Sequence, residues 1–249
     1  MIPIKTATEL EKMHRVCQIS AGALAAGGRA VKPGATTEDV DAAVYDYIVQ
    51  HGAKPNFKGY GGFPGSACVS LNDTVIHGIP SPKQVIRPGD IVSIDTGAVL
   101  EGFHGDNAYT FACGEVDGEA ERLLRITEEA LYKGIEAAQP GAQVGDIGYA
   151  VQSFVEAAGF SVVRAYVGHG VGRRLHEEPE VPNVGKPGRG ARLVPGMVIA
   201  IEPMVNQNGF DVYVKPDGWT VKTKDGGLSA HFEHTVAITK DGPVILTKL

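Results

Sequence analysis

The sequence has 249 residues, of which 43% are hydrophobic and 21% charged, and its formal net charge at pH 7 is −6. This balance is typical of a globular protein and argues against nucleic acid or an anionic membrane as the main partner. No apolar run approaches the ~18 residues of a membrane-spanning helix. The opening "MIPIKTATELEKMHRV" lacks a basic segment followed by an apolar block, so we expect no signal peptide. Three cysteines without a CxxC pair fit a reducing cytoplasm.

Four segments carry the sequence signals of helices. A Thr6-x-x-Glu9 capping signal precedes apolar residues at helical spacing, which predicts the first helix. The second opens with "TTED" and stops at Gly52, because glycine commonly follows the last turn of a helix. The expected helices span 7–30, 36–51, 118–138 and 144–158.

One offset of 107 residues relates the two halves of the chain. It aligns "PGATTEDVDAAVYDYIVQHGA" (33–53) with "PGAQVGDIGYAVQSFVEAAGF" (140–160), and seven of the 21 positions are identical. The same offset aligns "PGDIVSIDTG" with "PGMVIAIEPM", so Glu202 repeats Asp95. Chance similarity between amphipathic helices would not keep one register through three elements. We therefore predict an internal duplication covering approximately 10–112 and 117–240.

Apolar, β-branched runs predict strands between and after the helix pairs. The length permits one large core or two small ones, but no low-complexity linker divides the chain. We therefore expect a single domain, 1–249, of the α+β class, with an antiparallel sheet in the middle and helices outside. The expected strands span 67–71, 90–96, 104–112, 162–167, 197–203, 210–215 and 231–238.

Two carboxylates share one face of the predicted hairpin "IVSIDTGAVLEGFHGDNAYTF". With a turn near Glu101-Gly102, Asp95 lies opposite Ala108 and diagonal to Asp106 on one face of the sheet. Both cannot stay ionised in a buried site unless a cation lies between them. The alternative is that Asp95 caps a turn and Asp106 bonds to the "GDN" loop, and the hairpin alone leaves this choice open.

Three further polar residues occur in apolar strand patterns. Glu202 repeats Asp95, and Glu233 in "AHFEHTVAI" shares its predicted face with His231 and Thr235. His169 lies between glycines in "VGHGVG", which permits close backbone approach and an unusual turn. Together with the hairpin carboxylates they predict an oxygen-rich site suited to Mn(II), Fe(II), Co(II) or paired Zn(II).

Five separated motifs resemble those of the methionine aminopeptidases. They are "NDTVIHGIP", "IDTGAVLEGFHGDNAYTF", "GHGVGRRLHEEP", "VIAIEPM" and "FEHTVAIT", in the family's order over essentially the whole chain. We expect neither the insertion of type II enzymes nor a zinc-binding N-terminal extension, so the sequence resembles the compact, bacterial-style type I. The resemblance implies the pita-bread fold, in which two pseudo-symmetric halves enclose a dinuclear metal centre.

The resemblance also implies roles for individual residues. Two divalent metal ions (Co, Mn, Fe or Zn) would be held, the first by Asp95 and the second by His169 and Glu202, with Asp106 and Glu233 bridging. Glu202 would also accept the proton of a metal-bridging water. His77 and His176 would contact the scissile amide and the developing oxyanion. The implied catalytic residues are His77, His176 and Glu202, and the implied metal ligands are Asp95, Asp106, His169, Glu202 and Glu233.

The family binds the methionine side chain in a pocket of aromatic residues and cysteine. The matching positions here are Tyr60, Phe63, Cys68 and Trp219. The chain departs from the family's common residues at Phe57, Gly61, Phe63 and Leu175. These departures bear on pocket shape and substrate range and leave the expected metal ligands unchanged.

The resemblance further implies removal of the initiator methionine from nascent polypeptide N-termini with a small second residue, by a cytoplasmic monomer. A monovalent cation is expected near Asn72 and Ser229. A basic cluster around "KPGRGARL" has two interpretations, a solvated loop or a ribosome contact; its residues are Arg173, Arg174, Lys186, Arg189 and Arg192. Two other functions stay open: an Xaa-Pro aminopeptidase or prolidase, and a non-catalytic binding module of the same fold.

Overall fold

The computed structural model describes residues 2–249, and its four helices match the predicted ones closely. Thr6 and Glu9 form a reciprocal capping box at the start of the first helix, and Thr36 and Asp39 form another at the second. The Asp117 side chain accepts from the backbone N–H groups of Glu119 and Ala120 in the first turn of the third helix. These caps fix where the helices begin. The helices are α1 (Ala7–Ala30), α2 (Thr37–Gln50), α3 (Gly118–Ala137) and α4 (Val144–Ala157).

The strands are antiparallel to their neighbours and several are only two or three residues long. A short 3-10 helix, η1 (Tyr60–Gly62), lies between the first two. The strands are β1 (Lys54–Pro55), β2 (Ala67–Leu71), β3 (Thr74–Ile76), β4 (Ile91–Leu100), β5 (Phe103–Ala112), β6 (Ser161–Val162), β7 (Gly168–Gly170), β8 (Glu177–Val181), β9 (Val198–Ile201), β10 (Met204–Asn206), β11 (Val212–Val214), β12 (Val221–Thr223), β13 (Ser229–His231), β14 (Glu233–Thr239) and β15 (Gly242–Ile245).

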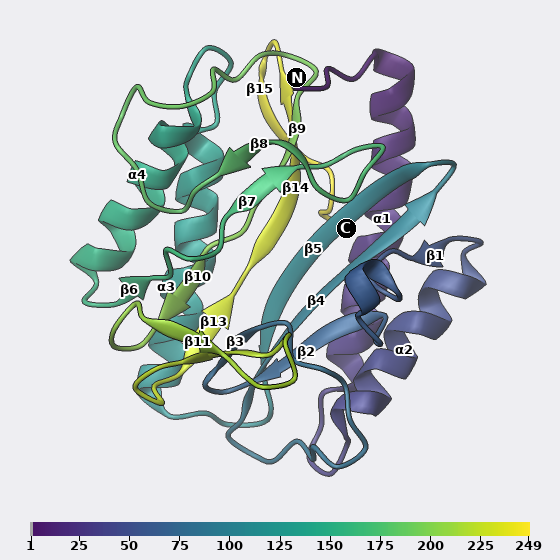
Figure 1. Cartoon of the computed structure of the whole chain (residues 1–249), viewed down its shortest axis with the longest axis vertical. Coiled ribbons are helices and arrows are strands. Elements are labelled where there is room, and N and C mark those ends of the chain that lie inside the picture. The colour runs from purple at the N-terminus through teal and green to yellow at the C-terminus, as the bar shows by residue number, and fades with distance from the viewer. Residues whose placement is uncertain (1) are drawn as a thin grey trace.

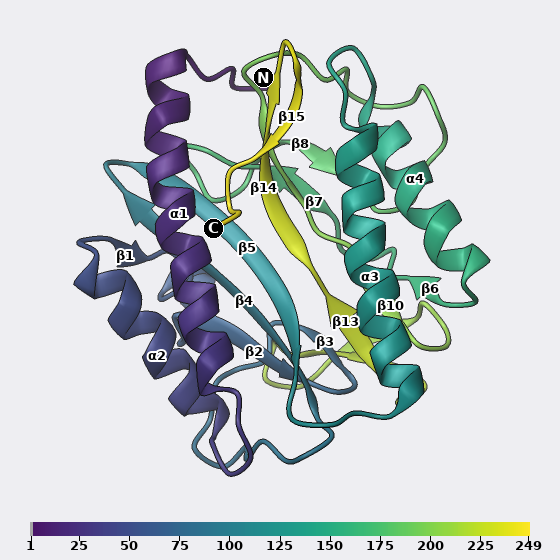
Figure 2. The same cartoon turned by 180° about the vertical axis from the view of Figure 1, so that it is seen from behind.

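A nine-stranded sheet crosses the molecule in the order β1-β4-β5-β14-β9-β7-β8, with β2 paired to β4 and β15 paired to β14. Helices α1 and α3 cross one face of this sheet (Figure 2), whereas strands and loops occupy the face seen in Figure 1. One buried apolar cluster lies beneath α1 and α2 and another beneath α3 and α4. The predicted α+β class is confirmed. Two helix pairs, each with its own apolar cluster, support the proposed duplication.

The β4–β5 hairpin has the predicted register. It turns at Glu101 and Gly102, whose φ angles are 51° and 78°, and Asp95 pairs with Ala108. Strand β4 nevertheless continues to Leu100, beyond the predicted end at residue 96. Asp95 therefore lies in the middle of a strand and caps no turn, whereas Glu202 follows directly after the end of β9.

Other strand predictions were wrong in detail. Residues 163–167 are not a strand; the predicted 162–167 is reduced to β6, and His169 lies in the separate strand β7. The predicted strand 231–238 is interrupted at Phe232, which separates β13 from β14. The three-residue strands β3, β10 and β12 were missed, because so few residues cannot show a clear alternation, and the five-residue strand β8 was missed as well. Within residues 2–249, no helix is both long and apolar enough to cross a membrane.

Candidate active site

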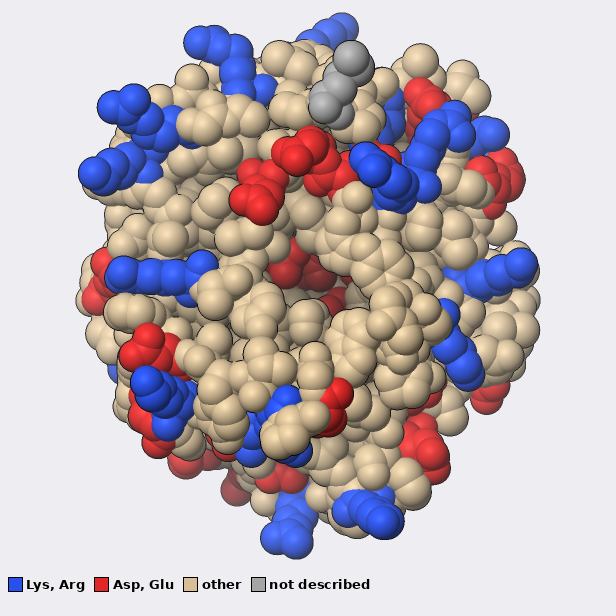
Figure 3. Space-filling model, viewed as in Figure 1, with Lys and Arg blue, Asp and Glu red and all other residues tan. Residues whose placement is uncertain are grey.

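A cavity of about 230 Å³ opens on the face of the sheet that the helices leave uncovered. Figure 3 shows it as a central hollow with acidic side chains at its floor. Every residue predicted to bind the divalent metals, the substrate or methionine lines it, although the sequence did not single out Ile76, Tyr166 and Val167. The lining residues are Phe57, Tyr60, Phe63, Cys68, Ile76, His77, Asp95, Asp106, Tyr166, Val167, His169, Leu175, His176, Glu202, Trp219 and Glu233.

Strand pairing explains why the carboxylates meet. Asp95 of β4, Ala108 of β5 and Glu233 of β14 occupy one row across three neighbouring strands. Paired residues project to the same face, so two carboxylates flank the small side chain of Ala108. Asp106 lies two residues along β5 and projects to that face as well. The sheet thereby fixes three acidic groups in one place.

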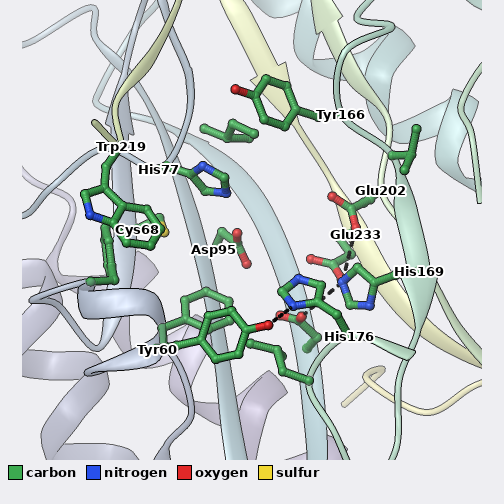
Figure 4. Close-up of a pocket in the computed structure, with 16 residues that line it drawn as sticks. Tyr60, Cys68, His77, Asp95, Tyr166, His169, His176, Glu202, Trp219 and Glu233 are labelled. Atoms are coloured by element: carbon green, nitrogen blue, oxygen red, sulfur yellow. Dashed lines mark hydrogen bonds and ion pairs between the residues drawn. The ribbon is translucent and has the colours of Figure 1, made fainter. Parts of the chain in front are cut away.

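The tightest group of ligand atoms comes from three strands. Asp106, His169 and Glu233 each offer an atom within 4.8 Å of the others'. Asp95 and Glu202 border the same space, where Figure 4 shows their carboxyl groups turned toward the cavity. Oxygen ligands with one imidazole suit a divalent first-row cation.

The peptide backbone sets the orientation of His169. Its Nδ1–H donates to the Gly170 carbonyl (2.9 Å), which leaves Nε2 free to accept. Nε2 lies 3.7 Å from Asp106 Oδ2 and 3.5 Å from Glu202 Oε1. The flanking glycines permit close strand packing, because a Cβ on either would collide with a neighbouring carbonyl. The unusual turn expected at His169 does not form, because His169 lies in the extended strand β7.

Several acidic oxygens in the cavity have no partner. Asp95 Oδ1, Asp106 Oδ1 and Glu233 Oε1 are buried and form no hydrogen bond with the protein. Unpaired buried carboxylate oxygens are costly, and a bound cation is the usual compensation. The donor set therefore fits divalent metal ions.

Burial shifts the pKa values of the carboxyl groups and of His169 in the cavity, and repulsion between the carboxylates adds to the shift. Burial raises the pKa of Asp95 to about 7. The pKa values of Asp106 and Glu233 are raised by burial and then by neighbouring carboxylates, and that of Glu202 by burial and then by Asp95. Burial lowers the pKa of His169 to about 4, so its ring is neutral and able to ligate. Without a cation the carboxyl groups retain protons, which metal binding would displace.

His77 and His176 approach the cavity from loops. His77 has a φ of 58° and makes edge contacts with the rings of Tyr166 and Trp219, whose centroids lie 5.9 and 6.1 Å away. The His176 Nδ1 lies 2.7 Å from the Tyr60 hydroxyl, and its ring lies 4.2 Å from that of His169. When the Tyr60 hydroxyl donates, Nε2 of His176 carries the ring proton.

A buried ion pair holds the segment next to His176. Lys5 Nζ lies 2.7 Å from Glu177 Oε2, and both side chains are almost fully buried. Glu177 Oε1 also accepts from the backbone N–H of Arg174 (3.1 Å). The Lys5 backbone N–H donates to the Gly196 carbonyl (2.7 Å). The N-terminal segment is therefore packed against the loop that carries His176.

The apolar wall of the cavity contains the predicted methionine-binding residues. The rings of Phe63 and Trp219 meet edge to face at 5.2 Å, and Cys68 is 4% exposed. Burial raises the pKa of the Cys68 thiol, so it is a neutral apolar group. A Cβ at Gly61 would lie 3.2 Å from the Trp219 ring, so the absence of a side chain there leaves that ring uncrowded.

The expected monovalent-cation site and the basic cluster both lie outside the cavity. The backbone N–H of Ser229 donates to the Asn72 carbonyl (2.9 Å), so these residues are adjacent. In the basic cluster, Arg173 pairs with Glu9 at 2.9 Å. The other members, Arg174, Lys186, Arg189 and Arg192, are exposed.

Comparisons with known proteins show which family and fold the chain is similar to. The description of metallopeptidase family M24 matches residues 11–240. The methionine aminopeptidase of Clostridium acetobutylicum is 51% identical over 247 residues, 99% of each chain. The solved methionine aminopeptidase from Thermotoga maritima is similar over 100% of both chains, with a TM-score of 0.98 and 48% identity. The prolidase from Pyrococcus horikoshii has a TM-score of 0.79 and 27% identity, but only 63% of it is covered. The predicted pita-bread fold is confirmed.

Proposed function

The chain belongs to metallopeptidase family M24, among its methionine aminopeptidases, and on this premise we propose how its own residues remove an N-terminal methionine. The observation that carries the proposal is a set of buried, partnerless carboxylate oxygens at the end of an apolar pocket. The family requires divalent metal. That the number is two, and which element is bound, are parts of the proposal.

The five polar residues of the cavity floor would hold the cations. When bound, the cations would supply Lewis acidity, which polarises the scissile carbonyl and lowers the pKa of the attacking water. The chain's part is to present neutral imidazole and ionised carboxylates in a fixed arrangement. The proposed ligands are Asp95, Asp106, His169, Glu202 and Glu233.

Glu202 is proposed as the proton acceptor. It lies just after β9, and its backbone carbonyl accepts from the Asn183 side chain (3.0 Å), which fixes its position. Its carboxyl group borders the cavity, within reach of a water between it and the substrate. It would take the proton of the attacking water and later deliver it to the leaving amine.

The two loop histidines are proposed to bind the peptide group. His176, oriented by Tyr60, would donate from Nε2 to the carbonyl oxygen as negative charge develops on it. His77 would contact the scissile amide from the opposite side of the cavity, where Figure 4 places it above Asp95. Both rings are largely neutral at pH 7, because burial lowers the pKa of each.

Methionine would occupy the apolar wall beside this centre. Tyr60, Phe63, Cys68 and Trp219 present ring edges and a thiol, which suit a flexible thioether. A preference for a small second residue is part of the proposal by similarity to the family. Proposed physiological substrates are the N-termini of nascent polypeptides.

Cleavage of two tripeptides tests the function. Chelated protein should cleave neither Met-Ala-Ser nor Ala-Pro-Ser, and Mn(II), Fe(II) or Co(II) should restore release of Met from the first alone. Release of Ala from Ala-Pro-Ser would instead indicate the proline-directed activity of prolidase-like relatives. Cleavage of neither substrate with any metal would favour a non-catalytic module. Titrating the metal during this assay also counts the ions needed per chain.

We further propose that the protein works in the cytoplasm as a monomer and contacts ribosomes through the basic cluster. The exposure of Arg174, Lys186, Arg189 and Arg192 supports the contact. Reversing these four charges should abolish co-sedimentation with ribosomes while cleavage of Met-Ala-Ser continues. Unchanged co-sedimentation would leave the cluster as a solvated loop.

A further inference from the structure

His231 is a buried histidine for which the proposed reaction has no role. It ends β13, two residues before Glu233, and is 1% exposed. Its Nε2 has no hydrogen-bond partner in the protein. A polar ring atom left unpaired in a dry interior is unfavourable, so the position calls for a partner that forms under working conditions.

The backbone at His231 is fixed on both sides. Its N–H donates to Thr110 Oγ1 (2.9 Å), and the Thr110 hydroxyl donates to the His231 carbonyl (2.9 Å). On the other side it pairs with Met204 of β10. The backbone contacts fix where the ring is attached, and dense packing around this buried side chain leaves room for only small rotations.

The His231 ring approaches the Oε2 atom of Glu202. His231 Nε2 lies 3.8 Å from Glu202 Oε2, whereas Glu202 Oε1 lies 3.5 Å from His169 Nε2. The two oxygens of one carboxyl group thus face different histidines. Oε1 faces the proposed metal ligands and Oε2 faces His231.

We propose that His231 is a positioning residue for Glu202, with Nε2–H of the buried ring donating to Oε2 of the carboxyl group. Closing the separation to the roughly 2.9 Å of an N–H···O bond requires only a small rotation of either side chain. The bond would fix the carboxylate plane and hold Oε1 toward the metal centre. This inference rests on the proposed role of Glu202.

The alternative role for His231 is that of an additional metal ligand. Within residues 2–249 the group of ligand atoms lying within 4.8 Å of one another consists of Asp106, His169 and Glu233, and His231 is not part of it. The nearest acidic oxygen to His231 is the one turned away from His169. The geometry favours hydrogen bonding to the carboxylate over ligation.

Three variants separate these roles. His231→Leu removes the N–H, and His231→Gln keeps an N–H near the same position. His234→Leu is the control, because His234 is a partly buried neighbour whose Nδ1 bonds to Thr247 (2.9 Å) and which lines a groove on the other side of the sheet. We expect His231→Leu to lower kcat for Met-Ala-Ser at least about tenfold, the scale of one hydrogen bond to a charged group. KM should change little, His231→Gln should recover most of kcat, and His234→Leu should retain it.

A spectroscopic readout tests the bond apart from catalysis. In protein with ¹⁵N-labelled histidine and bound Zn(II), we expect one slowly exchanging Nε2–H resonance that disappears in His231→Gln and shifts in Glu202→Gln. An unprotonated Nε2 would overturn the proposal, as would a fall in Mn(II) affinity of more than tenfold in both His231 variants. Equal kcat in His231→Leu and His234→Leu would also overturn it. If wild-type protein cleaves no Met peptide, the proposed function fails, and the resonance still decides the hydrogen bond.

Discussion

The two walls of the cavity are built differently. The metal-ligand wall comes mainly from paired strands, and Asp106 and Glu233 on it are each 3% exposed. The substrate wall comes largely from loops and η1, where Tyr60 is 48% exposed and His77 has a left-handed backbone. Repelling carboxylates need a framework that cannot relax, and a hydrogen-bonded sheet provides it. A wall that must admit and release peptides can be more mobile.

Changing a carboxylate on the metal-ligand wall should have the largest effect on turnover. Glu202→Gln keeps the side chain's shape but removes the proton acceptor and weakens the metal site, so kcat should fall by about 10²–10⁴. The measurement is kcat for Met-Ala-Ser with metal in excess. Glu128→Gln, behind the sheet next to Tyr109, is the matched control and should be neutral. Near-normal turnover in Glu202→Gln would exclude its proton role.

A change on the substrate wall should lower kcat less. His176→Ala removes the proposed donor to the developing oxyanion, and kcat should fall by about 10²–10³. Tyr60→Phe removes only the hydroxyl that orients His176, so its effect should be tenfold or less, about one neutral hydrogen bond. If Tyr60→Phe equalled His176→Ala, Tyr60 would have a role of its own in the reaction.

The methionine pocket should respond in substrate binding. Trp219→Leu removes a ring edge from the pocket, and KM for Met-Ala-Ser should rise roughly threefold to tenfold with little change in kcat. Norleucine-Ala-Ser, which lacks the sulfur, is the informative comparison. Discrimination between the two substrates should shrink in the variant. An unchanged ratio would place sulfur recognition elsewhere.

A separate effect, on stability rather than on turnover, concerns the metal-ligand wall alone. Burial raises the pKa of Asp95 to about 7 in the folded, metal-free protein, well above its unfolded value. The folded state then holds more protons, so this contribution is full near pH 4 and is lost as the pH rises to 7. Each unit of pKa shift corresponds to about 1.4 kcal/mol.

Denaturant unfolding at pH 4.5 to 8 measures this loss. The stability gained from Mn(II) should grow across the window, because the cation stabilises the ionised carboxylates. A gain that is the same at every pH would mean that the metal-free cluster holds no extra protons.

The sequence predicted local geometry better than assembly. The register that pairs Asp95 with Ala108 follows from strand alternation and one turn, both of which are local. The strand that carries His169 escaped prediction, because its flanking glycines give no β signal and serve interstrand packing. The row joining Glu233 to the hairpin depends on pairing between β5 and β14, which are far apart in the chain. The family resemblance, not periodicity, supplied the roles of the site residues.

The environment of His231 could not be predicted from the sequence. Its sequence context placed it on the predicted face of Glu233, but the break at Phe232 and its approach to Glu202 arise only when β10 and β13 pair. Tyr166 was missed for a similar reason, since it lies in an irregular segment without periodicity.

The buried pair of Lys5 with Glu177 has a practical consequence. Breaking such a pair from one side strands a charge in the interior. A deletion that reaches Lys5 should therefore loosen the loop that carries His176, although that residue lies far along the chain. Tags and fusions are best joined ahead of the segment and leave Lys5 in place. An enzyme that trims other chains at their beginning depends on its own opening residues as part of its active-site framework.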